Sequence, residues 1–161
     1  GLFGFLFFVI YLHLGWSVLS GALTLSAMIL PTIVRTSEEA IRAVPDAYRE
    51  ASFALGSTRW QTVTSVVLPS ARPGIVTGVM LAVGRAIGET AAVIFTAGSS
   101  LRLPGTLLDP TRTLPVHFYI LAREGISLEN AYSTAAVLIL LILAINIAAH
   151  TIMNRLARKE T

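Results

Sequence analysis

The chain has 161 residues, of which 54% are hydrophobic and 13% charged, and it contains no cysteine. Ordinary soluble domains carry about 25% charged residues, so this composition predicts an integral membrane protein. The net charge of +3 comes from scattered single basic residues, which excludes a nucleic-acid-binding patch. The lack of cysteine excludes disulfides, thiolate metal sites and cysteine nucleophiles.

Apolar segments in chain order predict an all-α, polytopic transmembrane helix bundle. Residues 1–14 are apolar but shorter than the roughly 20 residues that cross a bilayer. Since the chain also begins with glycine inside this run, we expect it to be the end of a truncated span of a longer protein. Residues 17–34, 73–98 and 131–153 are long enough to be full spans.

The distribution of basic residues predicts the orientation of these spans. Loops on the cytoplasmic side of a membrane are enriched in lysine and arginine. The connection at 99–130 carries only three arginines, whereas the loop at 35–72 carries five and the C-terminal tail three more basic residues. The loop and tail residues are Arg35, Arg42, Arg49, Arg59, Arg72, Arg155, Arg158 and Lys159. We therefore expect the 35–72 loop and the C-terminus to be cytoplasmic and 99–130 to be an outer loop.

The outer loop is expected to be largely irregular. Pro104, Gly105, Pro110 and Pro115 interrupt any regular structure there. Residues 114–122 are apolar enough to form either a short interfacial helix or a re-entrant turn.

The loop at 35–72 is predicted to form short helices. Thr36 and Glu39 have the spacing of a capping box, which predicts a helix start, and Pro45 would end that helix. Asp46 can cap a second helix. Gly56 suits the residue just past a helix end, where φ is commonly positive.

The second of these helices has a narrow, mostly apolar stripe. Its members recur at helical spacing and are Tyr48, Ala51, Ser52 and Leu55. Ser57 or Thr58 can restart a helix that ends before Pro69. The pattern leaves two readings open: a hairpin that packs on its own membrane domain, or a surface that binds a partner.

The same loop resembles a family signature. Glu50-Ala51-Ser52, then Gly56, then Val66-x-Leu68-Pro69 is similar to the Glu-Ala-Ala (EAA) motif of permease subunits of bacterial ATP-binding-cassette importers. Serine replaces the second alanine and valine replaces isoleucine. The resemblance implies a type I importer permease fold and identifies the loop as a coupling helix that docks on a cytoplasmic ATPase. Tyr48, Glu50, Ala51, Leu55 and Gly56 are the expected coupling residues.

The predicted span at 73–98 contains two charged residues, Arg85 and Glu89. Arg85 lies 12 residues after Pro73, about 18 Å along a helix and so near the bilayer centre. A charge there costs on the order of 3 kcal/mol. The i, i+4 spacing allows an ion pair that fixes helix register. The alternative is that Arg85 meets an anionic substrate, because a guanidinium offers a fork of donors suited to phosphate oxygens.

Small residues follow both sides of this span. Gly74, Gly78, Ala82 and Ala86 recur every four residues, as do Gly84, Gly88 and Ala92. Such faces let neighbouring helices approach closely, so we expect close packing on two sides of this helix.

Three further segments resemble the phosphate-specific importers: residues 33–40, the Arg85-Ala-x-Gly-Glu89-Thr-Ala sequence, and residues 113–119. Together they are more similar to the PstA-type permease than to its PstC-type partner. The resemblance implies partners: cytoplasmic ATP-binding subunits, a second permease in a heterodimer, an extracytoplasmic phosphate-binding protein and membrane lipid. It implies a multi-pass protein of a bacterial or archaeal plasma (inner) membrane. The PstC-type partner or a permease for another oxyanion remains the alternative.

No catalytic site is expected in this chain. His13, His117 and His150 are far apart in the sequence, so they indicate no metal site, and no cofactor is expected. The chain also lacks a phosphate-binding loop, because Gly84-x-x-x-Gly88 is not followed by Lys-Ser/Thr. We therefore predict a transport subunit, with ATP hydrolysis in another subunit.

Overall fold

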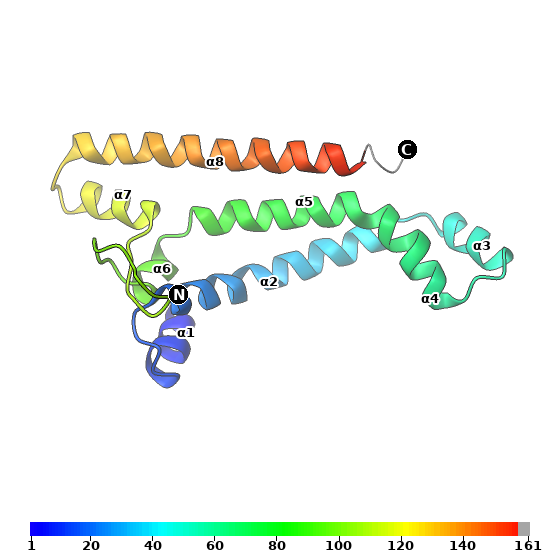
Figure 1. The fold of residues 1–161 in the computed structure, drawn as a ribbon, viewed down its shortest axis with the longest axis horizontal. Helices are drawn as coiled ribbons and strands as arrows, with labels where there is room; N and C mark the ends of the chain where they lie inside the picture. Colours follow the sequence, from blue (N-terminus) through cyan, green and yellow to red (C-terminus); the bar gives the residue numbers. More distant parts are fainter. Residues whose placement is uncertain (158–161) are drawn as a thin grey trace. The chain divides into compact units, whose positions relative to one another are not determined.

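The computed structural model describes residues 1–157, without the side chains of residue 150 and residues 152–157. Every regular element in this part is helical, as the sequence predicts (Figure 1). Three helices are long and apolar enough to cross a membrane: Val18–Arg42, Arg59–Ile87 and Leu128–Ala149. The chain divides into two compact units, the first of residues 1–29 and 84–146, and the second of residues 30–83 with the segment from residue 147.

The first unit contains short helices and parts of longer ones. It comprises the short helix α1 (Leu2–Gly4), the π-helix η1 (Phe5–Tyr11), the start of α2 (Val18–Arg42), α6 (Ala91–Thr96), α7 (Leu114–Arg123) and most of α8 (Leu128–Ala157). The first unit also includes the last turn of α5 (Leu68–Ile87), from residue 84 on. The apolar segment at 114–122, for which the sequence allows an interfacial helix or a re-entrant turn, is helical as part of α7. Helix α8 begins three residues before the predicted start of the last apolar segment.

The core of the first unit lies between α6 and α7. Val93 and Ala97 pack against Val116 and Ile120, with Leu25 of α2 at the margin. Helix α2 approaches this core at Gly21, where a Cβ atom would lie 2.9 Å from Cβ of Ala97. A larger residue at position 21 would therefore separate α2 from α6.

The connection between α6 and α7 is irregular, as its prolines predict, but backbone hydrogen bonds tie it to the first turn of α2. The amide of Val18 donates to the carbonyl of Asp109 at 3.0 Å, and that of Leu19 to the carbonyl of Leu107 at 2.9 Å. These bonds satisfy donors that a helix N-terminus otherwise leaves unpaired.

Within the same connection, the carboxylate of Asp109 closes a tight loop. Its Oδ2 accepts hydrogen bonds from the amides of Gly105 and Thr106, both at 2.9 Å. The bond from Thr106, followed by that from Gly105, lowers the pKa of Asp109 below its usual value. The ionised form of Asp109 therefore stabilises this turn.

The second unit is built around the end of α2 and the start of α5. It adds α3 (Asp46–Ala54), α4 (Arg59–Thr62), the π-helical turn η2 (Val63–Val67) and most of α5 (Leu68–Ile87). Val44, Val67 and Ala71 form its buried core. At Gly74 a Cβ atom would lie 2.7 Å from Cβ of Ala40.

The close packing predicted for the span at 73–98 is confirmed on one side only. A Cβ atom at Gly78 would overlap the side chain of Thr36, so Gly74 and Gly78 are what bring α5 against α2. On the other predicted face, a Cβ atom at Gly84 would meet no atom within 4 Å in the described part of the chain.

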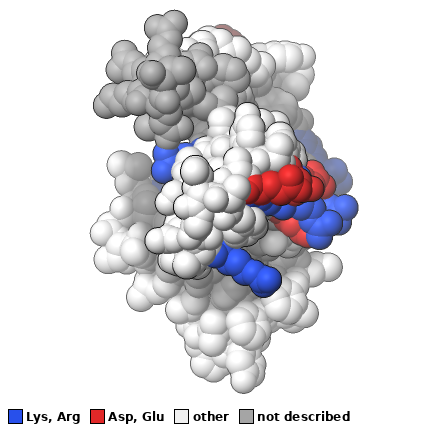
Figure 2. Space-filling model, turned by 90° about the vertical axis from the view of Figure 1, so that its right-hand side faces the viewer, with Lys and Arg blue, Asp and Glu red and all other residues white. Residues whose placement is uncertain are grey.

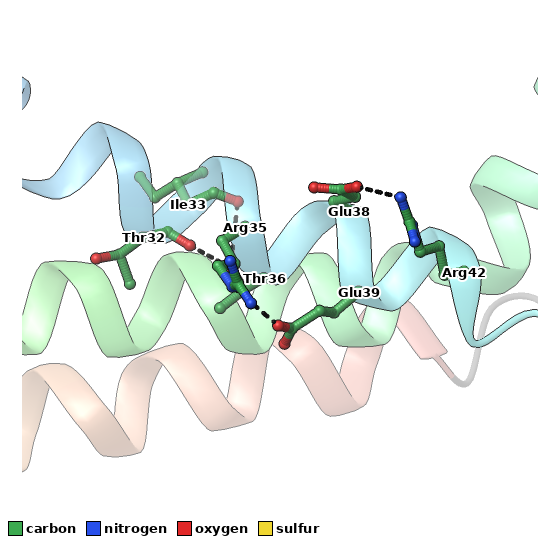
Figure 3. A network of polar contacts seen from close by, with 7 residues as sticks. All are labelled: Thr32, Ile33, Arg35, Thr36, Glu38, Glu39 and Arg42. Atoms are coloured by element: carbon green, nitrogen blue, oxygen red, sulfur yellow. Dashed lines mark hydrogen bonds and ion pairs between the residues drawn. The ribbon is translucent and has the colours of Figure 1, made fainter.

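The predicted helix start at Thr36 is wrong. Helix α2 runs without interruption through this position to Arg42 (Figure 3). The hydroxyl of Thr36 donates to the carbonyl of Thr32 at 2.9 Å, and Glu39 pairs with Arg35 at 3.3 Å. The side chains that would have capped a new helix therefore form bonds within α2. The span predicted at 17–34 and the first helix predicted in the loop are a single helix.

The predicted helix end before Pro69 is also wrong. The helix that starts at Arg59 continues through Pro69 and Pro73 to Ile87. In a regular α-helix the Pro69 ring would clash with a carbonyl four residues earlier. The π-helical turn η2 ends at Val67, two residues before Pro69, and its wider winding gives room for the ring.

The predicted span at 73–98 is not one helix. Helix α5 ends at Ile87, residues 88–90 are not helical, and α6 begins at Ala91. Two residues of the basic tail that predicts the orientation, Arg158 and Lys159, lie outside the described residues. The side chain of Arg155 in the same tail, and that of His150, are also outside the described part.

Candidate functional site

Two parts of the chain carry the residues that the sequence singles out. One is the hairpin of residues 45–62, with α3 and α4, which is called the coupling hairpin after the role that the sequence resemblance implies. The other is the helix break, defined as residues 85–92 between α5 and α6. They belong to different compact units and are described separately.

Arg49 fixes the start of the coupling hairpin. Its guanidinium donates to the carboxylate of Asp46 at 3.2 Å and to the backbone carbonyl of Ile41 at 2.9 Å. The second bond joins α3 to the last turn of α2. Asp46 is the first residue of α3, and Pro45 occupies the cap position, so the predicted capping role of Asp46 is wrong.

The end of α3 has the predicted glycine turn. Gly56 has φ of +82°, its amide donates to the carbonyl of Phe53 at 2.9 Å, and the amide of Ser57 donates to that of Ser52 at 3.2 Å. This pair of bonds is the Schellman motif. The prediction of positive φ at Gly56 is confirmed, and the turn reverses the chain within three residues.

A capping box starts α4 at Thr58, one of the two positions where the sequence predicts a helix restart. The amide of Gln61 donates to the hydroxyl of Thr58 at 3.3 Å, and the amide of Thr58 donates to Oε1 of Gln61 at 2.9 Å. The signal was present in the sequence, since Thr58-x-x-Gln61 has the required spacing.

A buried hydrogen bond joins the two helices of the coupling hairpin. The hydroxyls of Ser52 and Thr62 lie 3.0 Å apart, and both residues are buried. The predicted stripe on α3 is therefore divided: Ser52 faces α4, whereas Tyr48, Ala51 and Leu55 remain exposed. The bond also explains the serine in the Glu50-Ala51-Ser52 sequence, because an alanine would leave Thr62 unpaired. Sequence reasoning missed Thr62, ten residues away.

The exposed ridge of the coupling hairpin comprises Tyr48, Ala51 and Leu55. Tyr48 is 54% exposed and Leu55 is 87% exposed, and Glu50 and Gly56 are exposed beside them. Figure 2 looks onto this end of the second unit and shows acidic and basic side chains close together among uncharged surface. An aromatic and an aliphatic anchor next to charged residues is typical of a protein interface.

The helix break has a different geometry from the predicted ion pair. Oε1 of Glu89 accepts a hydrogen bond from the amide of Ala92 at 3.2 Å, in the first turn of α6. Thr90, at the cap position, makes no side-chain cap bond. Glu89 thus satisfies one of the donors that the start of α6 leaves free.

Arg85, in the last turn of α5, is exposed. Among the described side chains, ion pairs join Arg35 to Glu39, Arg42 to Glu38 and Arg49 to Asp46, and none is shown between Arg85 and Glu89. The predicted pairing of Arg85 with Glu89 is therefore not formed, because the helix ends between them and Glu89 turns to the backbone of α6. Among the described residues no three histidine or acidic side chains come together as a metal site.

Apolar helices of spanning length, with an amphipathic hairpin between two of them, define a polytopic membrane protein. A family model described as "Binding-protein-dependent transport system inner membrane component" matches residues 2–161. The chain therefore belongs to the family of inner-membrane components of binding-protein-dependent transport systems. No solved structure gives a significant match.

Relatives agree with this family. The chain is 40% identical to the probable ABC transporter permease protein YqgI of Bacillus subtilis, over 100% of this chain and 60% of that protein. It is 35% identical to the phosphate transport system permease protein PstA of Xylella fastidiosa, over 96% of this chain and 55% of PstA. It is also 35% identical to PstC of Xylella fastidiosa, over 91% of this chain and 46% of PstC. The chain thus spans about half to three-fifths of the length of these relatives.

Proposed function

We propose that the chain is part of a permease subunit of an ATP-driven phosphate importer. The observation that carries the proposal is the exposed ridge on a hairpin fixed at both ends, in a member of a permease family. A protein surface that transmits force must not deform, and the coupling hairpin meets this requirement. Arg49 holds its start, Gly56 reverses its chain, and the Ser52–Thr62 bond joins its helices.

The coupling hairpin contacts cytoplasmic ATP-binding subunits through Tyr48, Glu50, Ala51, Leu55 and Gly56. Helix α4 continues through η2 into α5, so that Arg59–Ile87 is one helix of 29 residues. A displacement of α4 is therefore carried along a continuous helix to the residues around Arg85. The loop and the C-terminus lie in the cytoplasm, as the distribution of basic residues indicates.

Arg85 contacts the anion in transit. Its guanidinium is exposed and forms no ion pair within the described residues, and its planar fork of donors matches the oxygens of an oxyanion. Glu89 belongs to the same path, where it holds the start of α6 beside Arg85. Phosphate as the substrate is supported by the PstA and PstC names of relatives. An extracytoplasmic phosphate-binding protein delivers the anion, and a second permease completes the path.

The relationship to PstC supports one alternative within this function. The chain is as similar to a PstC protein as to a PstA protein, at 35% identity to each. The chain would then be the other member of the permease heterodimer, or a permease for a similar oxyanion. Competition of phosphate uptake by sulfate and by molybdate distinguishes a phosphate system from one for another oxyanion.

The test is uptake of radiolabelled phosphate by the complete system in cells that lack their own importer. Arg85→Gln is expected to reduce uptake to background while the complex still assembles. Arg102→Gln is the matched control, because Arg102 is an exposed arginine of the same compact unit outside any helix. Normal uptake by an assembled Arg85→Gln complex would exclude Arg85 from the substrate path.

A further inference from the structure

The coupling hairpin also carries a groove, which is concave where the exposed ridge protrudes. It has a volume of about 260 Å³ and lies between α3 and the helix formed by α4 and η2. Its apolar lining comes from Ile41, Phe53, Val63, Val67 and Leu68. The volume lies below the roughly 300–1,000 Å³ of small-molecule pockets, which favours a single inserted side chain.

Two arginines line this groove, and they differ in their partners. Arg49 is used within the hairpin, by Asp46 and the carbonyl of Ile41. Arg59 is exposed, and the described part of the chain shows no ion pair or side-chain hydrogen bond to it. The chemistry that completes the groove is therefore an apolar side chain next to a carboxylate, which a guanidinium binds through two parallel hydrogen bonds.

The distance from the bilayer argues against lipid as the occupant. The predicted span begins at Pro73, which places Arg85 near the bilayer centre. Arg59 precedes Pro73 by 14 residues on the same continuous helix and so lies about 21 Å beyond the start of that span. The headgroup layer is only about 5–8 Å thick on each side. The groove therefore opens beyond the lipid phosphates, at a depth where a soluble protein surface lies.

Charge also argues against the C-terminal segment of this chain as the occupant. That segment carries Arg155, Arg158 and Lys159 against one acidic residue, Glu160, so its net charge has the same sign as that of Arg59. Like charges placed opposite each other oppose binding.

The groove opens on a different side of α3 from the exposed ridge. Arg49 and Phe53 lie roughly 100–160° around α3 from Tyr48, Ala51 and Leu55. A partner that receives α3 into a cleft therefore contacts both the ridge and the groove.

We propose that this groove is a second contact site for the cytoplasmic ATPase, which inserts one apolar side chain into it and places a carboxylate against Arg59. The inference rests on the proposed function, since it takes the ATPase as the partner of the ridge. It adds an element that the ridge lacks. The ridge inserts into the partner, whereas the groove receives a side chain from it, and the two together fix the orientation of the ATPase.

Site-specific photo-cross-linking in the complete transporter, reconstituted in lipid nanodiscs, tests the proposal. Benzoylphenylalanine is placed at Val63, which lines the groove and is 41% exposed. The reference position is Leu55 on the ridge, and the control is Thr64, which is exposed but outside the groove. We expect adducts with the ATPase from positions 63 and 55 and not from 64, identified by mass spectrometry.

The outcomes separate this inference from the proposed function. Capture of the ATPase from position 55 but not from 63, or an adduct of 63 with lipid or the second permease, overturns the second contact site and leaves the function standing. No capture from either position overturns both.

Charge reversal provides an independent measurement. Arg59→Glu is expected to lower retention of the ATPase on the purified permease about tenfold, whereas Arg59→Lys keeps the charge and loses less. Arg42→Glu, at an exposed arginine on α2 outside the groove, is the control and should change retention less than about twofold. Equal retention by Arg59→Glu and wild type contradicts the proposed carboxylate contact.

Discussion

The coupling hairpin and the helix break use polar side chains in opposite ways. In the hairpin they pair with each other: Arg49 with Asp46, Ser52 with Thr62, Thr58 with Gln61. At the helix break, Glu89 pairs with the backbone and Arg85 stays exposed. The hairpin is therefore built to keep one shape, whereas the helix break presents a charge.

The largest effect is expected from a substitution that breaks the hairpin at its turn. Gly56→Pro cannot adopt φ of +82°, because proline is restricted to about −65°, and it also removes the bond to Phe53. We expect the ATPase to be lost from the purified permease and uptake to be lost, because the folded hairpin is destabilised by about 3 kcal/mol or more. Gly125→Pro is the matched control, at a positive-φ glycine outside the hairpin. Full ATPase yield from Gly56→Pro would mean that the turn does not shape the contact.

The next effect concerns the bond between the two hairpin helices. Ser52→Ala and Thr62→Val each leave a buried hydroxyl unpaired and should each cost about 1–3 kcal/mol. The double variant should cost less than the sum of the two, with a coupling energy of about 1 kcal/mol. Thermal unfolding of the purified complex measures this cycle. Additive costs would show that the hydroxyls do not interact.

At the helix break, two variants separate the charge of Glu89 from its role as a cap. Glu89→Ala removes the acceptor for the Ala92 amide and should cost about 1 kcal/mol, with faster hydrogen exchange at that amide. Glu89→Gln keeps an acceptor oxygen and should reduce phosphate uptake less than Glu89→Ala does. If the two variants lose uptake equally while exchange differs, the charge itself is required.

The smallest effect is a pH dependence in the turn closed by Asp109. Because the bonds from Thr106 and Gly105 lower its pKa in the folded protein, its contribution is complete above the unfolded pKa of 3.8. The contribution is lost as the pH falls through the lower, folded value. The NMR shift of the Thr106 amide should therefore titrate with a midpoint below 3.8, and Asp109→Asn should abolish that titration. A midpoint at or above 3.8 would contradict the assigned bonds.

The class of protein and its apolar helices were predictable from the sequence, because membrane spans follow from local composition and length. Gly56 was predictable for a similar reason, since few residues other than glycine tolerate positive φ. Thr36 and Thr58 show the limit of such reasoning. Both have the spacing of a capping box, and only Thr58 forms one.

The apolar helices, the glycine turn and the family are predictable from the sequence alone, because each depends on residues that are near one another in the chain. Only the tertiary structure shows which side chains contact each other and where each helix ends. It placed Ser52 against Thr62, brought Gly78 onto Thr36, and ended α5 between Arg85 and Glu89. The partner of each polar group depends on which neighbouring groups are available in the folded chain. The residue pattern of a single segment does not show those neighbours.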